Sequence, residues 1–102
     1  MNNEQQQADA IDWEKAGYLL KAIGHPVRLQ VISLLSQHEQ MTVNDLVRET
    51  GCEQSLLSHH LIGMRLKGIL TARKEGLFVH YALRERNVVK ILDCIRHCDC
   101  IM

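Results

Sequence analysis

The stretch that decides the fold runs from Thr42 to Leu83, within three successive phrases of the sequence. These are MTVNDLVRETG, then CEQSLLSHHLIGMRLKG with apolar residues at helical spacing, then ILTARKEGLFVHYAL, which alternates around Glu75-Gly76. Helical spacing followed by alternation predicts a helix, a short turn, a second helix and a two-stranded hairpin. That order is typical of a winged helix-turn-helix. We therefore expect a mainly α fold with a small β-hairpin wing.

The boundaries of the other elements are predicted from proline, glycine and polar caps. We expect a first helix over residues 10–23 and a second from Pro26 to about Gln37, because a proline at the first helical position loses no hydrogen bond. Thr42 and Asp45 have the spacing of a capping box at the start of a third helix. The remaining expected elements are a helix over 54–67, strands over 69–74 and 77–83, and a last helix over 86–98.

The totals are those of one globular domain. The chain has 102 residues, of which 46% are hydrophobic and 24% charged, so it has enough apolar residues for one small core. Residues 1–9 are polar and glutamine-rich, and we expect a disordered tail there, followed by one domain over 10–102. No apolar run is long enough to span a membrane and no signal peptide is visible, so we expect a cytoplasmic protein without a membrane partner.

Three phrases carry a resemblance to a known family. AIGHPVRLQVISLL, SLLSHHLIGMRLKGIL and ARKEGLFVHYAL resemble the bacterial arsenic-repressor (ArsR/SmtB) family over Tyr18 to Cys98. The resemblance implies a transcriptional repressor that binds a palindromic double-stranded DNA operator and is released by an effector. It also implies a homodimer, which the wide apolar stripes of the first and last helices favour independently. The sequence has no phosphate loop, CxxC pair or paired carboxylates typical of an enzyme site.

The fourth expected helix has the polar face that base reading requires. Glutamine bonds adenine in a bidentate way, and serine and histidine suit base edges or phosphates. The net charge is zero, but residues 54–74 contain no acidic residue, and His60 adds to this local basic face. The alternative is a solvated helix face, and for His59 a solvated surface histidine. The DNA-binding residues that we expect are Gln54, Ser55, Ser58 and His59 for reading, and Arg65, Arg73, Lys74 and His80 for phosphates.

Glu53 departs from the family pattern, which commonly has serine just before the reading helix. Glutamate is a weaker cap and places a negative charge near the DNA. Its carboxylate is still favoured at a helix N-terminus by the helix dipole.

The cysteines crowd toward the C-terminus. Cys94 and Cys98 are four apart on the expected last helix, which predicts Cβ atoms about 5–6 Å apart. With Cys100 they form a thiol cluster that suits arsenite, cadmium or zinc, and His97 and Asp99 are possible further ligands. Each thiol also has a structural reading: Cys98 can pack in a dimer seam. Cys52 can form a hydrophobic staple with Leu57, or be a reactive thiol at the start of the helix.

Three functions compete on this basis. The first is a homodimeric DNA-binding repressor released by a thiol-binding metal or metalloid ion. The second is a redox or persulfide sensor of the same fold, although Ser33 stands where such family members usually have their second cysteine. The third is a winged-helix protein-interaction or metal-carrying module that does not bind DNA.

Overall fold

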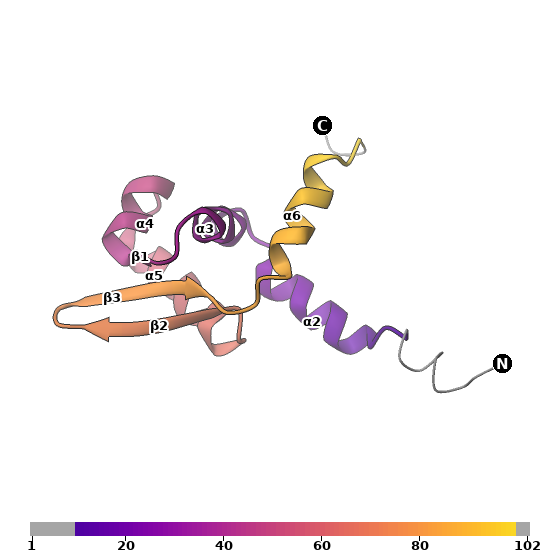
Figure 1. Ribbon diagram of the computed structural model, residues 1–102, viewed down its shortest axis with the longest axis horizontal. Helices are drawn as coiled ribbons and strands as arrows, with labels where there is room; N and C mark the ends of the chain where they lie inside the picture. Colours follow the sequence, from indigo (N-terminus) through magenta and orange to yellow (C-terminus); the bar gives the residue numbers. More distant parts are fainter. Residues whose placement is uncertain (1–9, 100–102) are drawn as a thin grey trace.

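The structure is a computed structural model that describes residues 10–99 of the chain. In chain order its elements are α2 (Trp13–Ile23), α3 (Pro26–Gln37), β1 (Met41–Thr42), α4 (Val43–Thr50), α5 (Gln54–Leu66), β2 (Leu70–Glu75), β3 (Phe78–Leu83) and α6 (Val88–Arg96). The helices pack around a sheet whose long hairpin projects to one side (Figure 1). The expected winged helix-turn-helix is confirmed, with α4 and α5 as the helix-turn-helix and β2 and β3 as the wing. No helix in residues 10–99 is long and apolar enough to cross a membrane.

The sheet has one strand more than the sequence predicts. Its order is β1-β3-β2, and both pairs are antiparallel. Strand β1 has only two residues, with Met41 opposite Tyr81, which is too short for an alternating pattern to reveal. The wing pairs along its whole length, and its last pair, Glu75 with Phe78, leaves a two-residue loop. Gly76 takes a φ of 62° in that loop, a conformation that tight hairpin turns need and glycine adopts freely.

The hydrophobic core lies between α3, α5 and the base of the wing. Within each of these two helices, the buried side chains are three or four residues apart and so lie on one face of the helix, which packs toward the core. The fully buried large side chains are Val31, Ile32, Leu35, Leu46, Leu57, Leu61, Met64, Leu70 and Val88.

The helix ends confirm some expectations and correct others. The capping box is present, since Asp45 N–H donates to Thr42 Oγ1 at 3.1 Å and Thr42 N–H to the Asp45 carboxylate at 3.0 Å. The first helix begins at Trp13 rather than at residue 10 because Asp12 caps it. The last helix also starts later than expected, at Val88, and ends at Arg96 rather than at residue 98.

The early end of α6 changes the expected geometry of its thiols. The His97 N–H donates to Cys94 O at 3.2 Å, and the Cys98 N–H donates to Ile95 O at 3.0 Å. Both bonds reach back three residues instead of four, which tightens the last turn. The sequence predicts that Cys94 and Cys98 occupy successive turns of one regular α-helix. This prediction is wrong, because the helix ends at Arg96 and its last turn is tighter.

One arginine links three helices. Arg28 donates through Nη1 to Ala22 O at the end of α2 (2.8 Å) and through Nε to His60 Nδ1 on α5 (3.0 Å). The guanidinium passes so close to α5 that a Cβ at Gly63 would lie 2.8 Å from Arg28 Nη2. The His60 ring also lies against His25, with 4.2 Å between the ring centroids. Arg28 therefore sets the position of α5 against α2 and α3.

His60 is part of the core and not of an exposed basic face. The expectation that it joins His59 on that face is wrong, because only 7% of its surface is exposed. Arg28 Nε–H is always a donor, so His60 Nδ1 accepts and Nε2 carries the proton of a neutral ring. Burial, followed by the charges of His25, Arg28 and His59, lowers the pKa of His60.

The free energy of unfolding should therefore fall as the pH drops below the ordinary histidine pKa of 6.5. The unfolded chain takes up a proton on His60 there, while the folded chain resists protonation until a lower pH. Urea unfolding at about pH 5 to 8 measures this slope. His60→Asn, whose amide oxygen can still accept from Arg28, should flatten it, while the exposed control His38→Asn should keep it. Equal slopes for the parent and His60→Asn would contradict a buried neutral histidine.

Candidate nucleic-acid interface

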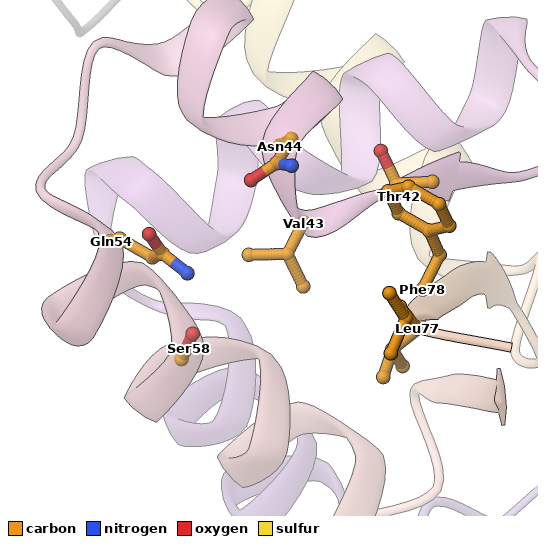
Figure 2. A pocket seen from close by; sticks show the side chains of 8 residues that line it. Thr42, Val43, Asn44, Gln54, Ser58, Leu77 and Phe78 are labelled. Carbon is orange, nitrogen blue, oxygen red and sulfur yellow. The ribbon is translucent and has the colours of Figure 1, made fainter.

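A hollow of about 260 Å³ lies where α4, α5 and the tip of the wing meet. Figure 2 shows Gln54 and Ser58 on one wall and Leu77 and Phe78 on the opposite wall, with Val43 between them. The hollow is thus shared by the start of the expected reading helix and by the wing. Its lining residues are Thr42, Val43, Asn44, Gln54, Ser58, Leu77, Phe78 and Val79.

The expected reading residues form two strips on α5. Gln54 and Ser58 are four apart and line the hollow. Ser55 and His59 have the same spacing, so they form a neighbouring strip, and both are exposed. The polar groups therefore lie along the first two turns of the helix, on the side away from the buried Leu57. This placement suits contacts with base edges by the N-terminal part of a helix in the major groove.

The expected phosphate-binding residues are not equally available. Arg73 pairs with Glu75 and donates to Gln40 Oε1 at 2.9 Å, so neighbours partly neutralise its charge. Lys74 is exposed and, among the described residues, forms no ion pair. His80 lies opposite Arg73 in the wing. Arg65 lies about 16 Å along α5 from Gln54, at a rise of 1.5 Å per residue. Arg73 and His80 thus share one face of the wing. Lys74 lies on the opposite face because side chains alternate along a strand, and Arg65 stands apart.

Glu53 is a stronger cap than its residue type suggests. Its two carboxylate oxygens accept from Ser55 N–H and Leu56 N–H, each at 3.0 Å. These two backbone hydrogen bonds hold the pKa of Glu53 below its ordinary value. The carboxylate therefore satisfies two N–H groups that a helix start leaves without partners. It still places a negative charge one residue before Gln54.

Sequence reasoning missed two parts of this surface. Val43 and Asn44 begin α4 and line the hollow, and N–H groups in the first turn of a helix suit a phosphate. The capping box at Thr42 was the available signal for this helix start. Leu77 and Phe78 form the other missed part, and the signal was two large apolar residues at a hairpin tip.

Two of the C-terminal cysteines lie on and just after α6, away from the wing tip (Figure 1). Cys94 is exposed on α6 and Cys98 is half-buried just beyond it, while Cys100 lies outside the described residues. Within residues 10–99 no group of three histidine, cysteine or acidic residues could hold a metal ion. His97 Nδ1 contacts Asp93 O at 3.0 Å, and neither His97 nor Asp99 completes such a group. Cys52 packs against the core, which includes Leu57, and the expected staple between the two stays a prediction.

Comparison with known proteins agrees with the fold. The family model of bacterial regulatory proteins of the arsR type matches residues 25–72. YgaV, an HTH-type transcriptional regulator of Escherichia coli, is 32% identical over 85% of this chain and 88% of its own length. The arsenical resistance operon repressor of Escherichia coli is 33% identical over 79% of this chain and 72% of its own.

Solved structures give the same picture. HlyU from Vibrio cholerae superposes with a TM-score of 0.75 at 31% identity, covering 87% of this chain and 96% of that one. BigR from Xylella fastidiosa, a transcriptional repressor, gives 0.78 at 26% identity, covering 96% and 98%. The family match and these relatives, together with the fold, therefore define a winged helix-turn-helix transcriptional regulator rather than an enzyme. Within that class the chain belongs to the arsR family.

Replacing Glu53 should separate its capping role from its charge. Glu53→Ala should lower the urea midpoint because two N–H groups at the start of α5 lose their acceptor. Glu53→Ser keeps a capping oxygen and removes the charge, so it should retain most of the stability and bind DNA of any sequence more tightly, with a gain that shrinks as salt rises. An Ala variant with the parent's midpoint would show that the cap is unimportant.

Proposed function

We propose that this protein is a homodimeric transcriptional repressor that a thiophilic metal or metalloid ion releases from a palindromic DNA operator. The main observation in support of DNA binding is the hollow that α5 and the wing share. It has Gln54 and Ser58 of α5 on one side and the tip of the wing on the other, which supports a single DNA-binding face formed by both elements. A module that only binds proteins or carries metal has no need of this arrangement.

Gln54 and Ser58 are the residues that we assign to base reading. Gln54 is exposed at the first position of α5, where its amide can bond adenine N6 and N7, and Ser58 follows one turn later. Ser55 and His59 form the second strip and reach the next bases or phosphates. Lys74, Arg73 and His80 on the wing contact the phosphate backbone, with Arg65 at the far end of α5. These contacts fix the register of the protein without reading sequence.

Helices α2 and α6 supply the dimer interface in this proposal. Both lie at the end of the molecule away from the wing tip (Figure 1). Trp13 exposes 76% of its surface, and Tyr18, Leu20 and Ile95 are also exposed on these two helices. Large apolar side chains exposed at one end of a single chain are typically covered across a two-fold axis in a dimer. Such a dimer sets two α5 helices about one DNA turn, or 34–36 Å, apart.

The C-terminal thiols are the proposed effector site. Cys94 is exposed on α6, Cys98 follows the end of that helix, and Cys100 is placed with them by its sequence spacing alone. Thiolates bind soft ions such as arsenite and cadmium, and zinc as well. Ligation would give the end of α6 one fixed shape, which changes the dimer seam beside it. One relative of this chain is an arsenical resistance operon repressor, which supports this class of effector.

A redox signal acting on the same thiols is the second candidate. The exposure of Cys94 favours it, and a solved relative is described as reduced HlyU. Ser33 on α3 supplies no thiol, so the oxidised form would have to link cysteines within the C-terminal segment. Mass spectrometry of the treated protein distinguishes a disulfide or persulfide from a bound ion.

One variant on α5 and one on the wing test whether this face binds DNA. Gln54→Ala should weaken binding to the operator by about 1–3 kcal/mol and leave non-specific binding nearly unchanged, because it removes a base contact. Lys74→Ala should weaken binding to all sequences and lower the salt slope by about one unit. Fluorescence anisotropy with operator and scrambled duplexes measures both. Unchanged affinities and slopes in both variants would remove this face from the DNA contact.

Trp13→Asp should dissociate the dimer without unfolding the chain. The side chain is largely exposed in the single chain, so its loss leaves the core intact, while a charge in an apolar seam is costly. Sedimentation at micromolar concentration should show a dimer for the parent and a monomer for the variant. The exposed control Leu66→Asp on α5 should remain a dimer. A parent that sediments as a monomer would contradict the proposed assembly.

Cys94→Ser/Cys98→Ser should remain on DNA at ion concentrations that release the parent. The ion must favour the DNA-free state by a coupling free energy of about 1–3 kcal/mol, and the variant lacks its ligands. Anisotropy during titration with arsenite, cadmium and zinc measures release. Cys52→Ser is the matched control and should behave like the parent. Release of the double variant at the parent's concentrations would exclude the C-terminal thiols as the sensor.

A further inference from the structure

The tip of the wing carries two large apolar side chains. Leu77 exposes 95% of its surface and Phe78 exposes 53%. Leu77 is the most exposed large hydrophobic residue in the described part of the chain. Exposing this much apolar surface on a projecting loop is unfavourable in water. Burial of these side chains against a binding partner would therefore be favourable.

The backbone holds both side chains in place. Six consecutive residue pairs join β2 and β3, from Leu70 opposite Leu83 to Glu75 opposite Phe78. The loop that follows has only two residues and is turned by Gly76. Leu77 and Phe78 therefore project from the end of a fully paired ribbon, and little ordering of the backbone is needed before they bind.

Their position identifies the partner. Leu77 and Phe78 line the hollow whose other wall is Gln54 and Ser58 (Figure 2). A duplex whose major groove is read by α5 therefore continues toward the wing tip. Lys74, three residues before Leu77, adds a positive charge suited to the phosphates beside a groove. A protein partner is less suitable, because two side chains provide far less than the roughly 800 Å² per partner of a stable interface.

We propose that Leu77 and Phe78 form an apolar wedge that enters the DNA minor groove beside each half-site and partly unstacks one base step. Leucine and phenylalanine are among the side chains that kink DNA in this way. Pyrimidine–purine steps such as TpA unstack most easily, whereas A-tracts are stiff. The wedge therefore adds sequence preference at a step that no polar side chain reads. This inference rests on the DNA-binding face proposed above.

The experiment uses a palindromic duplex selected by the parent protein from random sequences. The fluorescent base 2-aminopurine is placed at successive steps flanking each half-site, and it brightens when its neighbour unstacks. The parent should brighten one flanking step on each side. It should also prefer TpA to ApA there by roughly tenfold, a typical effect of one base-pair position in such sites. Failure of the parent to bind any duplex would overturn the proposed function itself, and the wedge with it.

Leu77→Ser/Phe78→Ser is the variant that isolates the wedge. Both side chains are exposed, so folding should be unaffected, and Gln54 and Ser58 remain to bind the half-site. The variant should still bind the duplex but lose the fluorescence change and the TpA preference. Leu66→Ser, an exposed apolar residue at the other end of α5, should behave like the parent. A variant that keeps the step preference and the brightening would overturn the wedge. A variant whose dimer dissociates in sedimentation would also do so, by assigning the tip to a contact between copies.

Discussion

The two hydrogen bonds of Arg28 fix the relation between the two ends of this molecule. One side chain near the start of α3 donates to Ala22 O, near the end of α2, and to the buried ring of His60 on α5. Helix α2 carries part of the exposed apolar surface, and α5 carries the polar strips beside the wing. A shift of α2 is therefore coupled to α5 through the Arg28 guanidinium, which packs closely against Gly63, where a Cβ would lie 2.8 Å from Nη2.

This contact also explains why the core tolerates a histidine. The buried His60 is acceptable because Arg28 satisfies Nδ1, and an unsatisfied acceptor there would cost more than the bond contributes. Its Nε2 has no hydrogen-bond partner among the described residues, which is the remaining cost of placing a polar ring in the core. The three residues therefore depend on one another: Arg28 donates to His60, and the absence of a side chain at Gly63 leaves room for the Arg28 guanidinium.

Local signals in the sequence were enough for most of the fold. Pro26, Gly51 and the Thr42–Asp45 pair act within one helical turn, so their effects on helix ends can be read directly from spacing. Strand β1 could not be predicted, because its two residues become a strand only by pairing with β3. The burial of His60 was also beyond sequence reasoning. It depends on Arg28, which lies 32 positions away, and the neighbouring His59 looks equivalent but is exposed.

The candidate site divides in the same way. Helical spacing predicts Gln54 and Ser58 on one side of α5, whereas the opposite wall of the hollow comes from Leu77 and Phe78, which only the folded chain brings near them. The hydrogen bond from Arg73 to Gln40 likewise depends on a tertiary contact, since the two residues are 33 positions apart.

Amide hydrogen exchange of the free protein and of its complex with a selected palindromic duplex tests this division of the surface most directly. Contact with DNA through the hollow predicts protection in residues 42–58 and 73–80, with the exposed end of α6 unchanged. Protection confined to α2 and α6, with the hollow and the wing exchanging as in the free protein, would contradict it.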